Sequence, residues 1–175
     1  MVHSLLIETP RLRLRPFRPE AEADQRFIIA LVNDPAWVAN IGKRDVSTRE
    51  QAEAFLRNGP VAMVERLGFG LLMVESAADG TLLGMCGLIK RDTLPDVDIG
   101  FAFLPPYRAQ GYAREAAEAV LGWARRLGLG RVVAIVTPTN MASIGLLRRL
   151  GFGHEGSILQ NDETLLLMGW SAGAG

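Results

Sequence analysis

The sequence predicts an α/β fold built on a mixed, mostly antiparallel sheet, and two kinds of pattern indicate it. Asp98–Phe103 and Val132–Val136 are short apolar runs, and apolar residues recur at helical spacing after each of them. Two pairs of strand-like runs flank short polar turns, Ala78–Gly80 in the first pair and Asn161–Glu163 in the second. Turns of this composition join antiparallel strands into hairpins. Strand–turn–helix units combined with hairpins indicate the α/β class.

Local signals mark the elements of the first half of the chain. Pro16 and Pro19 end the first strand, and Asn33–Pro35 breaks the first helix because proline does not continue one. Ser47 can cap the next helix, with Glu50 three residues on completing a capping box. The expected elements are strand Leu12–Phe17, helix Glu20–Val32, a short helix or loop from Trp37 to Ile41, helical segments Gln51–Leu56 and Val61–Arg66, and strands Phe69–Glu75 and Thr81–Lys90.

Similar signals mark the second half. Apolar residues from Ala113 to Leu127 recur at helical spacing, and the continuous apolar run Val132–Val136 is typical of a buried strand. Asn140 or Thr139 can cap the helix that follows, and Gly151 ends it. The expected elements are strand Asp98–Phe103, the two helices and the strand just described, and the hairpin strands Ile158–Gln160 and Thr164–Trp170.

Composition bounds the class of protein. The 175 residues suit one domain over residues 1–175, without repeat or linker, and with a small-residue tail, 171–175, expected to be flexible. Apolar residues make up 49% and the formal net charge is zero, which argues against disorder and against nucleic-acid or membrane partners. A single cysteine, Cys86, excludes an internal disulfide and suits a cytoplasmic protein. A monomer and a homodimer are both compatible with this composition.

The segment between strand Asp98–Phe103 and the following helix has the character of an anion site. Arg108-x-x-Gly111-x-Ala113 places small residues where the chain turns and a ligand can approach the backbone; we call Arg108–Ala113 the anion turn. Free N–H groups at a helix start attract anions, and the planar fork of Arg108 suits phosphate oxygens. The alternative is a plain turn, because many helices begin this way without any ligand.

A second segment lies in the same position after strand Val132–Val136. Asn140 and Ser143 are three residues apart, so their side chains share one face of the helix. Either both side chains serve a ligand, or Asn140 is only a helix cap and Ser143 only a surface residue.

Together these segments resemble the GNAT superfamily of N-acetyltransferases. The match consists of Arg108-x-x-Gly111-x-Ala113, Asn140-x-x-Ser143 and Leu150-Gly-Phe152. Further segments resemble the branch of the ribosomal-protein-alanine acetyltransferases (RimJ/RimL-like), and these are Glu8–Pro16, Asn33–Pro35, Gly84–Asp92 and Asp98–Phe101. The resemblance spans roughly residues 5 to 170. It implies a GNAT-like fold, in which a central strand pair splays apart and helices flank the sheet.

The resemblance implies acetyl-CoA as co-substrate and no metal. The turn from Gln110 through Gly111 and Tyr112 to Ala113 would hold the pyrophosphate by backbone N–H groups, next to Arg108. The edge of Phe101, Ala102 and Phe103 could pair with the amides of the pantetheine arm as an added strand would. A backbone N–H near Phe101 or Ala102 could polarise the thioester carbonyl. Asn140 would bond to the pantetheine, and Ser143 would lie by the sulfur.

Direct attack on the thioester requires a neutral amine. Asp98 is the best candidate for a general base, because it precedes the cofactor strand; a solvated strand-end carboxylate is the alternative. Asp96 is a second candidate, and Glu155 and His154 are more distant ones. Ser143 is expected to bond to the departing sulfur or to relay a proton. Cys86 has apolar neighbours, which favour a buried structural thiol over an acyl-cysteine.

The expected acceptor is a primary amine, with the N-terminal α-amino group of a protein or peptide favoured by the resemblance. An α-amine has a pKa of about 7.7–8.0 and is partly neutral near pH 7, so it needs little help from a base. A small-molecule amine acetyltransferase and a non-catalytic acyl-CoA sensor are the alternatives. A nicotinamide-binding fold fails on the sequence, because Gly128-Leu-Gly130 follows a helix and has Val133 where a third glycine belongs.

Overall fold

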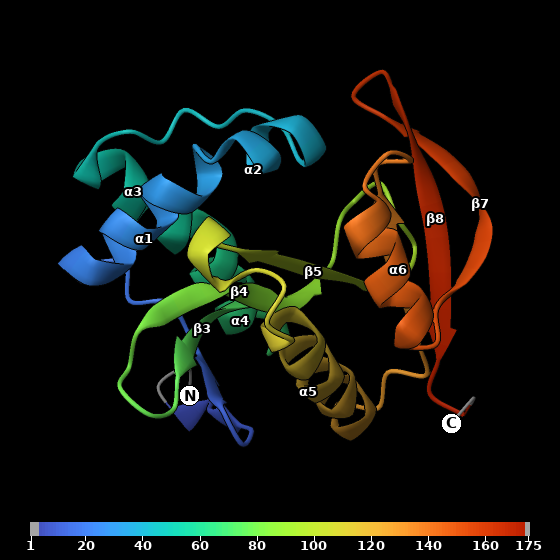
Figure 1. Cartoon of the computed structure of the whole chain (residues 1–175), viewed down its shortest axis with the longest axis horizontal. Helices are drawn as coiled ribbons and strands as arrows, with labels where there is room; N and C mark the ends of the chain where they lie inside the picture. The colour runs from blue at the N-terminus through green and yellow to red at the C-terminus, as the bar shows by residue number, and fades with distance from the viewer. Residues whose placement is uncertain (1–3, 174–175) are drawn as a thin grey trace.

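The computed structural model describes residues 4–173, in which eight strands form one sheet (Figure 1). The strand order is β1-β2-β3-β4-β5-β6-β8-β7, and every neighbouring pair is antiparallel except β5 with β6. The strands are β1 (Ile7–Glu8), β2 (Leu12–Arg15), β3 (Leu71–Ser76), β4 (Leu82–Ile89), β5 (Asp98–Phe103), β6 (Arg131–Val136), β7 (Gly153–Gln160) and β8 (Glu163–Ser171). The predicted α/β class and the mostly antiparallel sheet are confirmed.

Helices cover both faces of this sheet. Those of the first half are α1 (Glu22–Val32), α2 (Pro35–Asn40), α3 (Arg49–Leu56) and α4 (Ala62–Leu67), and a π-helical turn, Arg57–Val61, joins the last two. Those of the second half are α5 (Tyr112–Arg126) and α6 (Met141–Arg149). The predicted helices are present, and Trp37–Ile41 contributes to α2 because Pro35 takes the first helical position and Asp34 caps it.

The start of α3 differs from the expectation by one residue. Thr48, not Ser47, is the N-cap, and Gln51 rather than Glu50 completes the capping box. The Thr48 hydroxyl accepts from the Gln51 N–H, and the Gln51 side chain accepts from the N–H groups of Ser47 and Thr48. Ser47 with Glu50 and Thr48 with Gln51 both match the capping-box pattern, a hydroxyl residue followed three positions later by an acidic or amide residue. The sequence pattern alone therefore does not distinguish the two.

The strand ends also depart from the sequence pattern. β1 was not predicted, and β7 starts at Gly153 rather than Ile158. At the start of the tail that was expected to be flexible, Ser171 ends β8 and the Ala172 N–H donates to the Gly130 carbonyl. Residues 174–175 of that tail lie outside the described residues.

Alternation along the strands divides the core into two clusters on opposite faces of the sheet. On one face, Ile99 and Phe103 of β5 pack with the apolar sides of α5 and α6. On the other, Met73 and Met85 pack with α1, α2 and α3, and Ala102 contacts this second cluster. We call these the α5–α6 face and the α1–α3 face.

Strands β5 and β6 diverge after a single point of contact. Their ladder contains one residue pair, Asp98 with Val133, whereas β5 pairs with β4 over its whole length. The Val133 N–H also donates to the Val97 carbonyl at 2.9 Å. Beyond that point the edge of β5 facing β6 has no partner strand, which confirms the predicted splayed pair.

Candidate active site at the splayed strands

The anion turn connects the open end of β5 to the start of α5. A 3-10 turn, Pro105–Tyr107, follows β5, and the chain then takes left-handed backbone conformations at Ala109 (φ 59°) and Gly111 (φ 83°). Glycine is suited to such a φ because it has no Cβ. The Nε2 of Gln110 donates to the Pro106 carbonyl at 2.7 Å, so this side chain folds back onto the turn.

Helix α5 begins without a side-chain cap. Asp34, Thr48 and Asn140 cap α2, α3 and α6, whereas the N-cap of α5 is Gly111, which has no side chain to do so. The first intrahelical bond runs from the Glu115 N–H to the Gly111 carbonyl at 3.1 Å. The preceding N–H groups of a helix start have no intrahelical acceptor, and they concentrate positive potential there. At 15 residues α5 is the longest described helix, so its uncapped start fits a bound anion such as a pyrophosphate.

Arg108 braces this turn through two of its guanidinium nitrogens. Nε donates to the Phe103 carbonyl at 2.9 Å, and Nη2 donates to Asp34 Oδ2 at 2.6 Å. Burial opposes ionisation of Asp34, but the hydrogen bond and charge of Arg108 hold the pKa of Asp34 below its ordinary value. The expected phosphate contact of Arg108 is therefore accompanied by a structural role that the sequence did not reveal.

Helix α2 connects the two sides of the splay. At its start, Asp34 binds Arg108 of the loop that follows β5. At its end, the Asn40 carbonyl accepts from Thr137 Oγ1, in the loop that follows β6, at 3.0 Å. We refer to these two contacts as the α2 ties. The Asp-Pro pair at residues 34–35 could have signalled a capped helix, but nothing local in the sequence reveals the two long-range ties.

The edge of β5 lies where a strand-like ligand could pair. Phe101 and Ala102 are half-buried and Phe103 is buried. The phenylalanine side chains pack on the α5–α6 face and Ala102 on the α1–α3 face, so the ligand-facing groups are backbone ones.

Asn140 and Ser143 lie together at the start of α6. Asn140 Oδ1 accepts from the Ser143 N–H at 3.3 Å, so Asn140 is the helix cap. Both residues are half-buried, which leaves their remaining polar atoms within reach of a ligand on the α5–α6 face.

Asp98 lies at the point where β5 and β6 separate, and its carboxylate is buried. Its side chain is 1% exposed, and Arg91 Nε donates to Oδ2 at 2.8 Å. Oδ1 is buried and has no hydrogen-bond partner among the described residues. Burial raises the pKa of Asp98, and the charge and hydrogen bond of Arg91 oppose that rise. The solvated strand-end alternative is therefore wrong.

The structure does not bring Asp98 and Ser143 to one face of the sheet. Ile99 packs on the α5–α6 face, so strand alternation directs the neighbouring Asp98 to the opposite face. Helix α6, which carries Ser143, packs on the α5–α6 face through Ile144 and Leu147. Groups at the two residues could therefore meet only across the gap between β5 and β6.

Asp96 and Glu155 share a structural partner. Arg131 donates to Asp96 at 3.1 Å and also binds both oxygens of Glu155, and its hydrogen bonds lower the pKa of Glu155. Cys86 is buried, and this burial raises the pKa of its thiol, so it is not an available nucleophile.

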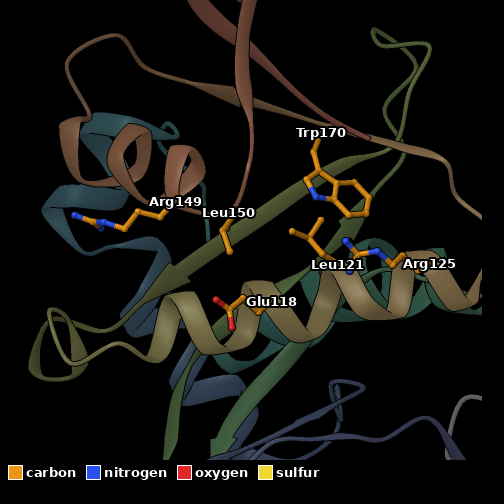
Figure 2. Close-up of a pocket in the computed structure, with 6 residues that line it drawn as sticks. All are labelled: Glu118, Leu121, Arg125, Arg149, Leu150 and Trp170. Atoms are coloured by element: carbon orange, nitrogen blue, oxygen red, sulfur yellow. The ribbon is translucent and has the colours of Figure 1, made fainter. Parts of the chain in front are cut away.

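A cavity of about 180 Å³ lies between α5 and α6, away from the anion turn. Figure 2 shows Leu121, Leu150 and Trp170 gathered between the helices, whereas Arg149 points away from them. The Arg125 guanidinium stacks 4.8 Å from the centre of the Trp170 ring. None of the expected site residues lines this cavity, so the candidate site is defined by the anion turn and the splay instead.

Two classes of site are not found in the described structure. No helix in residues 4–173 has the length and apolar character needed to cross a membrane. Over the same residues, no group of three His, Cys, Asp or Glu side chains could hold a metal ion.

The sequence and the fold place this chain among the acetyltransferases. Residues 11–153 match the family described as the acetyltransferase (GNAT) domain, so the chain belongs to the GNAT acetyltransferase family. The uncharacterised protein YkkB of Bacillus subtilis (strain 168) is 30% identical over 156 residues, which cover 86% of each chain. The uncharacterised N-acetyltransferase YnaD of the same strain is 28% identical over 151 residues, covering 86% of this chain and 84% of YnaD.

Solved structures share the fold. An acetyltransferase from Agrobacterium tumefaciens str. C58 has a TM-score of 0.77 at 25% identity, covering 95% of this chain and 94% of that one. A Salmonella typhimurium acetyl transferase that modifies the N-terminal serine of ribosomal protein L7/L12 has a TM-score of 0.79 at 15% identity, covering 95% and 99%. RimL, a ribosomal L7/L12 alpha-N-protein acetyltransferase solved in complex with coenzyme A, has a TM-score of 0.72 at 16% identity, covering 98% and 100%.

Proposed function

We propose that this protein transfers the acetyl group of acetyl-CoA directly to a primary amine, and that the acceptor is the N-terminal α-amine of a protein or peptide. The uncapped start of α5 beside the splayed strands is the observation that carries the proposal. It offers free N–H groups for a pyrophosphate next to an unpaired strand edge for an amide-containing arm.

Each part of acetyl-CoA is bound by a different segment of the site. N–H groups from Gly111 to Ala113 hold the pyrophosphate, and the β5 edge from Phe101 to Phe103 pairs with the pantetheine amides. A backbone N–H of that edge polarises the thioester carbonyl. The Asn140 amide bonds to the pantetheine, and the Ser143 hydroxyl donates to the sulfur as negative charge develops on it.

The amine would reach the thioester from the α1–α3 face. Asp98 is directed to that face, and its buried Oδ1, which has no hydrogen-bond partner among the described residues, can accept a proton from the amine through a water molecule. The ribosomal-protein acetyltransferases that share the fold support the peptide acceptor, and so does the RimJ/RimL-like sequence pattern. An α-amine is also the acceptor that places the smallest demand on this base.

An acceptor screen tests the proposal. The protein is incubated with acetyl-CoA and a mixed library of peptides with free or blocked N-termini, polyamines and other small amines, and the products are identified by mass spectrometry. We expect acetylation of free N-termini. Acetylation confined to small amines would overturn the peptide acceptor and leave the acetyltransferase standing; acetyl-CoA binding without any product would indicate a sensor.

We expect Ser143→Ala to slow turnover more than it weakens acetyl-CoA binding. The hydrogen bond from the Ser143 hydroxyl to the sulfur strengthens only as negative charge develops on the thiolate. Its removal should therefore lower kcat more than it weakens acetyl-CoA binding. General acid–base groups contribute about 10²–10⁴-fold, and a serine should lie near or below the lower limit. Steady-state kinetics and calorimetry measure the two effects, with Ser157→Ala on the exposed side of β7 as control. Equal losses in kcat and affinity would contradict this role.

We expect Asp98→Asn to lower turnover at neutral pH and to recover toward the wild-type rate at higher pH. Amine deprotonation by solvent then replaces the missing base. Asp96→Asn, whose carboxylate is tied to Arg131, is the matched control and should keep wild-type turnover. Unchanged turnover in Asp98→Asn with saturating acceptor would show that positioning alone accounts for catalysis.

Asp98→Asn should also change how the stability of the protein depends on pH. Because burial raises the pKa of Asp98 in the folded protein, the folded state keeps this proton to a higher pH than the unfolded state does. The contribution of Asp98 to stability is therefore fully present below its ordinary pKa and is lost as pH rises through the raised value. Urea unfolding from pH 4 upward should show this loss in the wild type and not in Asp98→Asn.

A further inference from the structure

Arg11, in the turn between β1 and β2, contacts the anion turn although about a hundred residues separate them in sequence. Its Nη1 donates to the Gln110 carbonyl at 3.0 Å, across a separation of 99 residues. Its guanidinium also lies 4.4 Å from the centre of the Tyr112 ring. A Cβ added at Gly111 would lie 3.2 Å from Arg11 Nη2, so the arginine lies directly against this glycine.

The bond to Gln110 determines which way the next N–H points. In a planar trans peptide the carbonyl of Gln110 and the N–H of Gly111 point in opposite directions. Glycine tolerates both signs of φ, so this peptide could rotate and direct its carbonyl toward the ligand instead. By holding the carbonyl, Arg11 keeps the Gly111 N–H directed away from itself.

Glu115 holds Arg11 in turn. Its Oε1 accepts from Arg11 Nε at 2.7 Å, and its Oε2 accepts from the Arg11 backbone N–H at 2.9 Å and from the Thr9 hydroxyl. Burial opposes ionisation of Glu115, but these hydrogen bonds hold its pKa below the ordinary value. Glu115, in the first turn of α5, thus holds Arg11 through both its backbone and its side chain.

We propose that Arg11 is a positioning residue for the cofactor site, which orients the Gln110–Gly111 peptide so that the Gly111 N–H faces the pyrophosphate of acetyl-CoA. The inference rests on the proposed function. It assigns to Arg11 the binding of the phosphate end of the cofactor and no part in the chemistry at the thioester.

The test compares Arg11→Met with Arg13→Met, which removes a similarly exposed arginine of β2 whose partner is Glu75. Calorimetry measures acetyl-CoA affinity, and kinetics with acetyl-pantetheine, which lacks the pyrophosphate, measures the thioester end separately. We expect Arg11→Met to lose about tenfold to a hundredfold in acetyl-CoA affinity, the range for one charged hydrogen bond, while Arg13→Met loses none. Turnover of acetyl-pantetheine should be the same in both variants.

Three outcomes decide the matter. Unchanged acetyl-CoA affinity in folded Arg11→Met would overturn this inference alone, whereas a wild type that binds no acetyl-CoA would overturn the proposed function. If Arg11→Met lost acetyl-CoA affinity and acetyl-pantetheine turnover in parallel, Arg11 would have a merely structural role, and the inference about Arg11 would also be overturned. If Arg11→Met is unstable because Glu115 is left unpaired, Arg11→Met/Glu115→Met removes both charges and should show the same selective loss. The Gly111 amide resonance should also shift in either variant without ligand.

Discussion

Gly111→Glu is expected to abolish acetyl-CoA binding, at a cost of about a hundredfold or more in affinity, because like charges brought together cost several kcal/mol. The new carboxylate would stand at the start of α5, where the anion turn offers N–H groups to the pyrophosphate. Calorimetry on the folded variant measures the loss. An unchanged affinity would remove the anion turn as the cofactor site.

Two control variants separate charge from backbone strain in this experiment. Gly128, after the end of α5, has the same φ of 83° and open space around an added Cβ, so Gly128→Glu has the same strain away from the site. Gly111→Ala introduces the strain at the site without the charge. Left-handed backbone costs an ordinary residue roughly 1–2 kcal/mol, so all three variants should lose stability. The two Gly111 variants should lose somewhat more, because their Cβ lies 3.2 Å from Arg11 Nη2, and only Gly111→Glu should lose binding outright.

Asp24→Ala is expected to produce a large loss of stability, about 3–5 kcal/mol in the free energy of unfolding. Asp24 is 1% exposed, and both of its oxygens accept from Arg15, at 2.9 and 3.0 Å. Its Oδ2 also accepts from the Arg18 N–H at 2.8 Å. Removing the carboxylate leaves the buried Arg15 guanidinium with only Glu75 as its acidic partner, so one positive charge is poorly compensated.

The matched control lies on the same helix. Glu22 pairs with Arg26 one turn along α1, but both side chains are at least half exposed. Exposed pairs contribute about 0.2–1 kcal/mol, so Glu22→Ala should change the urea midpoint little. Equal effects of the two alanine substitutions would show that the buried network contributes no more than a surface pair.

The parts of the fold that depend on local pattern could be predicted from the sequence. Apolar runs and helical spacing predicted β5, α5, β6 and α6, and the turns predicted both hairpins, because each depends on residues close together in the chain. Asn140 was predicted as one of two possible caps of α6, with Thr139, for the same reason, and it is the cap observed. β1 has only two residues, Ile7 and Glu8, too few for a periodic pattern.

The contacts that complete the site could not be predicted, because they join distant segments. Arg108 meets Asp34 across 74 residues and Arg11 meets Gln110 across 99. The burial of Asp98 depends likewise on the packing around the point where β5 and β6 part. Sequence identified the residues of the anion turn, whereas the side chains that hold it in shape come from elsewhere in the fold.

The sheet separates the apolar cluster of the α5–α6 face, next to the proposed cofactor site, from that of the α1–α3 face, from which the acceptor is proposed to enter. This separation is useful for redesigning the acceptor specificity. Exposed residues of α1, α2 and α3 can be randomised to seek new acceptors without repacking α5 or α6. The α2 ties join the loops on the two sides of the splay, so a grafted acceptor half should bring Asp34 and Asn40 with it. The acceptor side of the fold could therefore be exchanged while the cofactor side is kept.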